Sequence, residues 1–93
     1  MAQLDPETMR RLKALADPSR AAILLEAKRN PGISCGELVE RLGLSQPTVS
    51  HHLKELEECG LADIDRKGNR LLVCSHGPTV TELGREIVRI FAP

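Results

Sequence analysis

Apolar residues recur every three or four positions through the first third of the chain, which predicts two amphipathic helices. Each begins with an Asp-Pro pair, Asp5-Pro6 and Asp17-Pro18, in which the acid caps the helix and the proline suits its first position. Asn30-Pro31-Gly32 ends the second helix. The first helix, about 5–17, carries the apolar residues Met9, Leu12, Leu15 and Ala16. One side of the second carries Ala21, Leu24, Leu25 and Lys28.

The next apolar positions predict two helices separated by a short turn, a helix-turn-helix over about 34–60. Ser34-Cys35-Gly36-Glu37 has the S-x-x-E pattern of a capping box, and Gly43 breaks the helix that it opens. Ser45 caps the following helix, and Gly60 ends it. The inward-facing residues of the two helices are Leu38, Val39 and Leu42, then Val49, Leu53 and Leu56.

Beyond Gly60 the apolar period changes to two, which predicts a β-hairpin over about 62–75. Gly68-Asn69 suits a two-residue turn with glycine first. In that register residue 67 faces 70, 65 faces 72 and 63 faces 74, and one face carries Ala62, Ile64, Leu71 and Val73. A last helix follows over about 79–91. The sequence therefore predicts one mainly α domain over residues 1–93, with five helices and a two-stranded wing.

The outward face of the helix after Ser45 has the chemistry of a DNA recognition helix. Its leading half contains no acid, whereas Glu55, Glu57 and Glu58 all lie in its second half. A recognition helix inserts its leading end into the major groove, where small donors and acceptors meet base edges and phosphates lie close by. The predicted contacts are Ser45, Gln46, Thr48, Ser50, His51 and Lys54.

Three basic residues surround the predicted hairpin turn, namely Arg66, Lys67 and Arg70. A basic hairpin tip can lie along phosphates or probe a minor groove. A helix-turn-helix followed directly by such a hairpin is a winged helix-turn-helix, which predicts binding to double-stranded DNA. The alternative is a winged helix that serves only as a protein-interaction module.

Composition narrows the function classes without opposing this prediction. The chain has 13 Lys+Arg and 13 Asp+Glu, so its formal net charge is zero and local charge placement must supply the attraction to DNA. Phe91 is the only aromatic residue besides the histidines, which excludes a stacking platform for single strands. No motif indicates a nucleophile–base pair or a Gly-rich phosphate loop, so we expect neither an enzyme nor a cofactor.

The chain is expected in the cytoplasm. No apolar run approaches the roughly 20 residues that cross a bilayer, and the start of the chain has acids instead of an apolar signal core, so neither a membrane segment nor export is expected. Cys35, Cys59 and Cys74 are odd in number and include no C-x-x-C pair, which fits a reducing compartment.

Five segments together resemble the ArsR/SmtB family of bacterial repressors. They are Leu15–Arg20, Ile33–Leu38, Leu44–Lys54, Glu58–Leu61 and Arg66–Arg70, and the resemblance covers nearly the whole chain. It implies a homodimer packed through the first and last helices, bound to an inverted-repeat operator and released from DNA by an inducer. The apolar stripe of the last helix independently favours a symmetric partner, unless that helix only closes its own core. The predicted dimer residues are Met9, Leu12, Val80, Leu83, Ile87, Ile90 and Phe91.

The metal sites common in this family are not matched by the sequence. Residues 34–38 hold one thiol where many members have Cys-x-Cys, and no histidine follows His76 to serve with Glu82 and Glu86. A remaining candidate metal site is Asp63, Cys74 and His76, which the hairpin register brings near one another. Cys35, at a helix start, is a candidate redox sensor, which makes a thiol-responsive regulator the alternative signalling mode.

Overall fold

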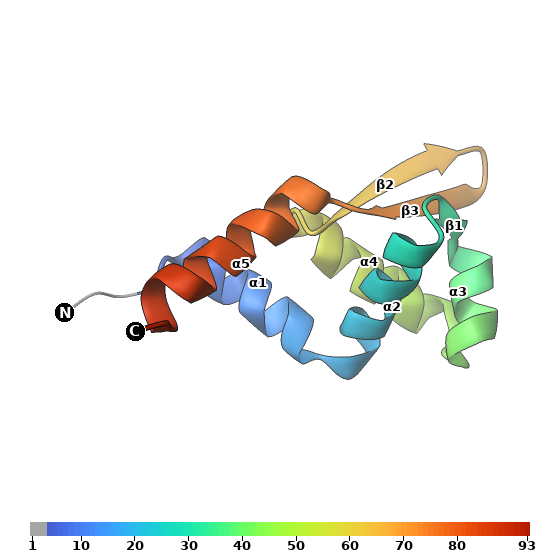
Figure 1. The fold of residues 1–93 in the computed structure, drawn as a ribbon. Coiled ribbons are helices and arrows are strands. Elements are labelled where there is room, and N and C mark those ends of the chain that lie inside the picture. The colour runs from blue at the N-terminus through green and yellow to red at the C-terminus, as the bar shows by residue number, and fades with distance from the viewer. Residues whose placement is uncertain (1–3) are drawn as a thin grey trace.

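The computed structural model describes residues 4–93, so residues 1–3 of the predicted domain lie outside the described residues. The elements follow the order α1 (Pro6–Ala16), α2 (Pro18–Arg29), β1 (Ile33–Ser34), α3 (Cys35–Leu42), α4 (Gln46–Glu58), β2 (Ala62–Lys67), β3 (Arg70–Ser75) and α5 (Gly77–Phe91). Five helices and a hairpin wing confirm the predicted winged helix-turn-helix (Figure 1). No helix within residues 4–93 is both long and apolar enough to span a membrane.

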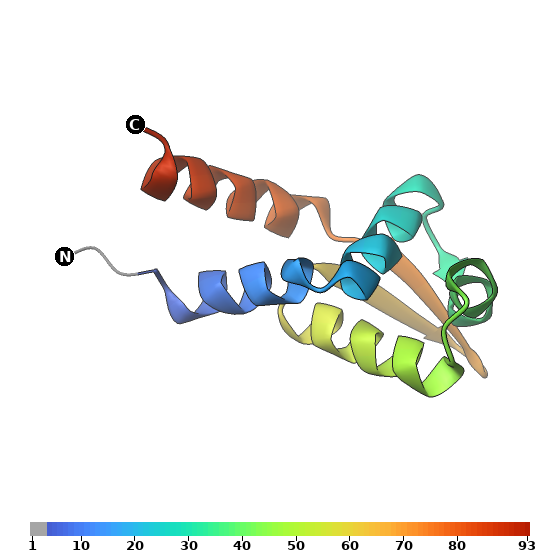
Figure 2. The ribbon, with the colours of Figure 1, turned by 90° about the horizontal axis from the view of Figure 1, so that it is seen from below.

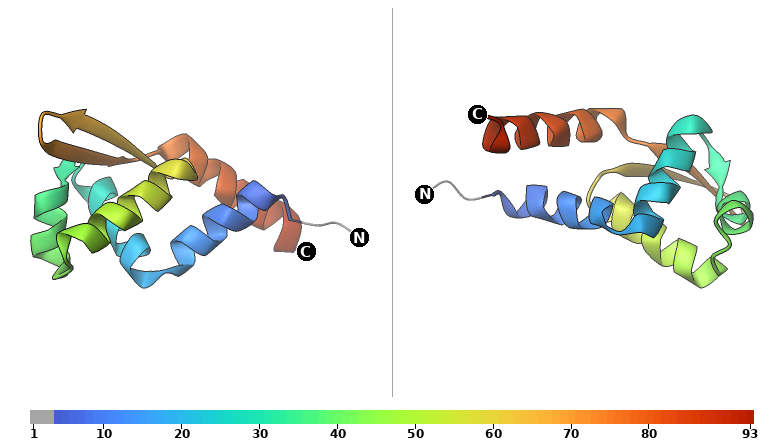
Figure 3. Two further views of the ribbon diagram at one scale, coloured as in Figure 1. Left: turned by 180° about the vertical axis from the view of Figure 1, so that it is seen from behind. Right: turned by 60° about the horizontal axis from the view of Figure 1, so that its bottom comes forward.

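The molecule is elongated, with extents of 47 × 21 × 19 Å. Figure 2 shows why: α1 and α5 run antiparallel beside each other at one end, where α1 begins and α5 ends, and the helix-turn-helix and wing tip lie at the other. The two views of Figure 3 show the same arm of α1 and α5 extending from the body. The core is aliphatic and joins the elements through Ile23, Leu38, Leu53, Leu56 and Val73, all at most 2% exposed.

The hairpin has the predicted register. Asp63 pairs with Cys74, Asp65 with Leu72 and Lys67 with Arg70. Gly68 has φ +59°, which the predicted glycine-first turn requires and other residues rarely adopt. Of the predicted inner face, Ala62 and Val73 are buried, while Ile64 and Leu71 pack partly against the core.

A third strand, β1, was not predicted. Ile33 pairs with Val73 and Ser34 with Leu72, so the sheet order is β1-β3-β2. Two residues are too few to show an alternating pattern. Ser34 is also the N-cap of α3, where its Oγ accepts a hydrogen bond from the Glu37 N–H at 3.1 Å. The wing and the helix-turn-helix therefore share a residue.

Three other expectations need correction. Asp5 occupies the N-cap of α1, but its side chain is exposed and makes no capping hydrogen bond. The buried face of α2 is Ile23, Leu24 and Ala27, while Leu25 is 44% exposed. The last helix begins at Gly77, two residues before the predicted start, because Pro78 fits its first turn.

Candidate nucleic-acid interface

Hydrogen bonds fix the first turn of α4. Ser45 Oγ accepts from the Thr48 N–H at 3.3 Å and donates to Thr48 Oγ1 at 2.8 Å. The second bond leaves the Thr48 hydroxyl hydrogen available to an outside acceptor. No acid lies in this turn, and the positive end of the helix dipole adds to its affinity for anions.

The outward face of α4 is where the sequence placed it. Gln46, Thr48, His51 and Lys54 are exposed and Ser50 is half-buried, whereas the opposite stripe of Val49, Leu53 and Leu56 is buried. Lys54 Nζ is 4.0 Å from Glu58 Oε1 and its side chain is largely exposed, so this tie is weak and leaves the ammonium free to reach a phosphate.

The two adjacent histidines of α4 have different surroundings. His51 is exposed on the outward face. His52 is half-buried, with Nδ1 3.5 Å from an Arg20 guanidinium nitrogen and Nε2 3.9 Å from Asp17 Oδ2. His52 therefore links α4 to the start of α2.

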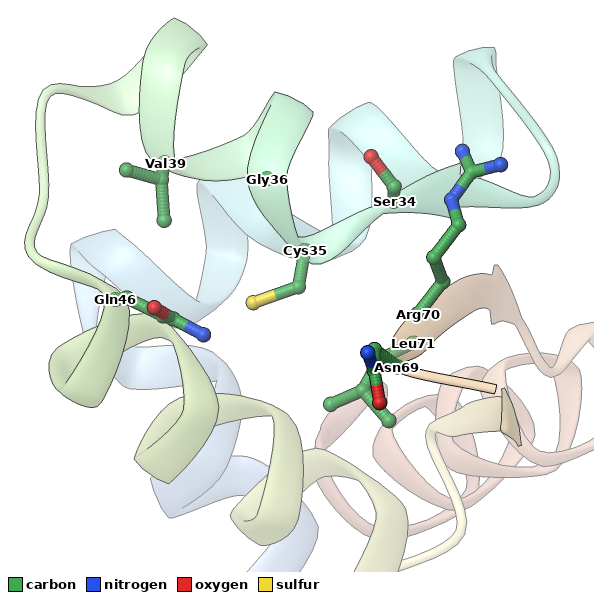
Figure 4. A pocket seen from close by; sticks show the side chains of 8 residues that line it. All are labelled: Ser34, Cys35, Gly36, Val39, Gln46, Asn69, Arg70 and Leu71. Carbon is green, nitrogen blue, oxygen red and sulfur yellow. The ribbon is translucent and has the colours of Figure 1, made fainter. Parts of the chain in front are cut away.

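The tip of the wing and the start of α4 face each other across one hollow of about 410 Å³. Gln46 comes from α4, Asn69, Arg70 and Leu71 from the wing, and Ser34, Cys35, Gly36 and Val39 from the β1–α3 segment (Figure 4). The Cys35 sulfur points into the hollow on the side of Gln46, and Cys35 is 7% exposed. Two predicted DNA contacts, Gln46 and Arg70, thus border the same space.

The three basic wing residues are not equivalent. Arg70 makes no ion pair with any residue of 4–93, and Lys67 Nζ lies 3.7 Å from Asp65 Oδ2 within the same strand. Arg66 is held by Glu57 of α4 through hydrogen bonds of 3.0 and 3.1 Å. These bonds lower the pKa of the Glu57 carboxyl below its usual value. Sequence inspection missed Glu57, because its partner lies nine residues away in another element.

The outer face of α5 is apolar and uncovered. Val88 is 64% exposed and Phe91 63%, with Val80 and Ile87 also exposed beside them. Among the predicted dimer residues Leu83 is wrong, because it is 3% exposed and belongs to the chain's own core. Met9, Leu12 and Ile90 are half-buried. Val88, which the sequence analysis did not select, adds to the exposed stripe.

The comparisons agree with this architecture. The helix-turn-helix domain family matches residues 15–64, more than half of the chain. The HTH-type transcriptional regulator YgaV of Escherichia coli is 33% identical over 82 residues, covering 88% of this chain and 83% of YgaV. The ArsR-like transcriptional regulator from Rhodococcus sp. RHA1 superposes with a TM-score of 0.81 at 30% identity, covering 92% of this chain and 80% of that one. The chain belongs to the ArsR/SmtB family.

As an ArsR/SmtB protein, the chain is a transcriptional regulator with a DNA-binding fold, which points away from an enzyme. Another relative is a probable mercury resistance operon repressor of Streptomyces lividans, 41% identical over 76 residues. That match covers 82% of this chain but 60% of the relative.

This ArsR/SmtB chain does not assemble the candidate metal trio. His76 Nδ1 lies 2.8 Å from Asp63 Oδ2, so two of the three groups meet. Across residues 4–93, however, no three His, Cys, Asp or Glu side chains gather closely enough to hold an ion. Cys74 is half-buried, and Cys59 is 2% exposed and belongs to the core.

Proposed function

We propose that the protein binds an inverted-repeat DNA operator as a homodimer in the cytoplasm and represses transcription there until an inducer lowers its DNA affinity. The observation that carries this is the shared hollow, which is lined both by Gln46 at the start of α4 and by Asn69 and Arg70 of the wing. Selection of bound duplexes from a random pool tests the proposal. An enriched palindrome is expected, and an unenriched pool would contradict it.

In this proposal the leading half of α4 enters the major groove. Gln46, Thr48, Ser50 and His51 read base edges, and Gln can bond adenine at two positions. Ser45 and Lys54 lie beside phosphates, and Lys67 and Arg70 hold the neighbouring backbone. A net charge of zero is compatible with these contacts. Because screening acts over about 8 Å at physiological salt, the charges close to the DNA determine the attraction, and distant charges contribute little.

The exposed stripe of α5 supports a specific dimer arrangement. Gly84 stands midway along the helix, and a Cβ added there would meet nothing within 4 Å. An antiparallel crossing of two α5 helices at Gly84 would set Val80 of one protomer opposite Val88 of its partner, and the reverse, as two-fold symmetry requires. Such a dimer presents two α4 helices to half-sites roughly 34 Å apart.

Neutralising the wing tip should lower the salt dependence of DNA binding. Lys67→Gln and Arg70→Gln are each expected to reduce the slope of log K against log salt by about 1, because each would release one fewer counterion. Fluorescence anisotropy with the selected duplex between 50 and 200 mM salt, an order-of-magnitude window for such effects, measures this. An unchanged slope in both variants would remove the wing from the contact set. A wild-type affinity without salt dependence would favour the protein-interaction module.

A thiol-responsive regulator is the second candidate, favoured by the position of the Cys35 sulfur in the hollow beside Gln46. An oxidised or modified Cys35 would occupy space that borders two predicted DNA contacts. Cys35→Ser is expected to leave DNA affinity within about twofold of wild type, since no hydrogen bond of α4 is lost. It should abolish release of DNA by peroxide, measured by gel shift. Cys74→Ser is the matched control, and a release that survives Cys35→Ser excludes Cys35 as the sensor.

A further inference from the structure

The ion pair between Glu57 and Arg66 joins the last turn of α4 to the outer half of the wing. Both guanidinium NH groups donate, one to each carboxylate oxygen, at 3.1 and 3.0 Å. A parallel, two-bond pair fixes the orientation of the two planes as well as their distance. Most exposed ion pairs contribute little, but this geometry is the exception in which a surface pair can hold a position.

The outer half of the wing has few other supports. Every residue from 65 to 70 is exposed. β1 pairs with β3 only at Leu72 and Val73, midway along β3, and does not reach residues 65–70. Among residues 4–93, the other ion pair of this segment, Lys67 with Asp65, stays within the wing. The Glu57–Arg66 pair is thus the one ionic link from the described outer wing to the rest of the molecule.

We infer that Glu57 and Arg66 form a strut that sets the position of the wing tip relative to α4, and that Arg66 acts as a positioning residue and not as a phosphate contact. This inference rests on the proposed function and revises the role that the sequence suggested for Arg66. It gives Glu57 a role in the proposed DNA-binding helix, although the chain has a formal net charge of zero.

The strut and simple electrostatics predict opposite changes in DNA affinity for the substitution Glu57→Gln. Glu57→Gln removes a negative charge, which by Coulomb attraction alone should tighten binding to a polyanion. If the strut exists, the same change makes the wing tip more mobile. The tip then loses more conformational entropy when it binds DNA, and the DNA affinity falls. The expected loss is about two- to fivefold, the range of a well-oriented surface pair.

The experiment measures anisotropy of a labelled duplex, taken from the random-pool selection, with Glu57→Gln, Arg66→Gln and the swapped pair Glu57→Arg with Arg66→Glu. Both single variants should bind more weakly, and the swapped pair should recover affinity to within about twofold of wild type. Arg66→Gln should keep the wild-type salt slope, unlike Lys67→Gln. Glu55→Gln is the matched control, because it removes an acid of the same helix that makes no ion pair within residues 4–93.

Tighter binding by Glu57→Gln, or a slope that falls by about 1 in Arg66→Gln, would overturn the strut. Backbone ¹⁵N heteronuclear NOEs of residues 66–70 provide a readout without DNA. They should fall in Glu57→Gln and remain unchanged in Glu55→Gln, and equal values in both would also overturn it. If wild type binds no duplex, the proposed function fails, whereas the NOEs still decide whether the strut exists.

Discussion

Val88→Asp is expected to convert the protein from a dimer to a monomer. Val88 is 64% exposed on the outer face of α5, so the substitution leaves the chain's own core intact. In an antiparallel pair of α5 helices it would bury a carboxylate opposite Val80 without a partner, at a cost of several kcal/mol. Sedimentation analysis should show the mass fall from twice the chain mass to the 10.2 kDa of one chain.

Loss of the dimer should weaken operator binding on the order of 100-fold, because each half-site would then be bound without the second. The circular dichroism of Val88→Asp should still report the helices, since the site is exposed in the single chain. Arg85→Gln is the matched control: it changes the net charge by the same amount on an exposed position of α5 away from the apolar stripe. A Val88→Asp protein that remains dimeric would rule out this face as the interface.

Replacing Ser50 and His51 with alanine should reduce discrimination between operator and random DNA by roughly 10- to 100-fold. Each good base contact contributes about 1–3 kcal/mol of discrimination, whereas phosphate contacts are indifferent to sequence. Neither residue belongs to the core, so folding should be unaffected. Anisotropy titrations with the selected duplex and with a scrambled duplex give the ratio directly.

Lys54→Gln supplies the contrast on the same helix face. It should weaken binding to both duplexes by a similar factor and reduce the salt slope by about 1, because the proposed complex places its ammonium beside a phosphate. If the Ser50 and His51 double variant loses affinity equally on both duplexes, α4 does not read bases through these side chains.

The sequence was informative where the signal is local. The exposed leading half of α4 follows from the 3.6-residue period and from Ser45 as its cap, and the hairpin register follows from a two-residue turn at Gly68-Asn69. His52 could be separated from His51 because adjacent helical positions differ by about 100°. In each case one element contains the whole pattern.

What the sequence could not give depends on contacts between elements. The pairing of Ile33 with Val73 joins segments far apart in the chain, and the two-residue β1 has no periodicity of its own. The sequence alone indicated an unpaired cation at Arg66, because its partner Glu57 belongs to another element and comes close only in the fold. Leu83 and Phe91 share the apolar pattern of α5, yet only the packing of α1 and the core determines which of them is covered.

Ser34 has a consequence for the motions of the molecule. It is at once the strand partner of Leu72 and the residue that caps α3. A fluctuation that displaces Ser34 from β3 is therefore expected to weaken the cap of α3 as well. The wing and the start of α3 are therefore expected to open together, as one cooperative unit.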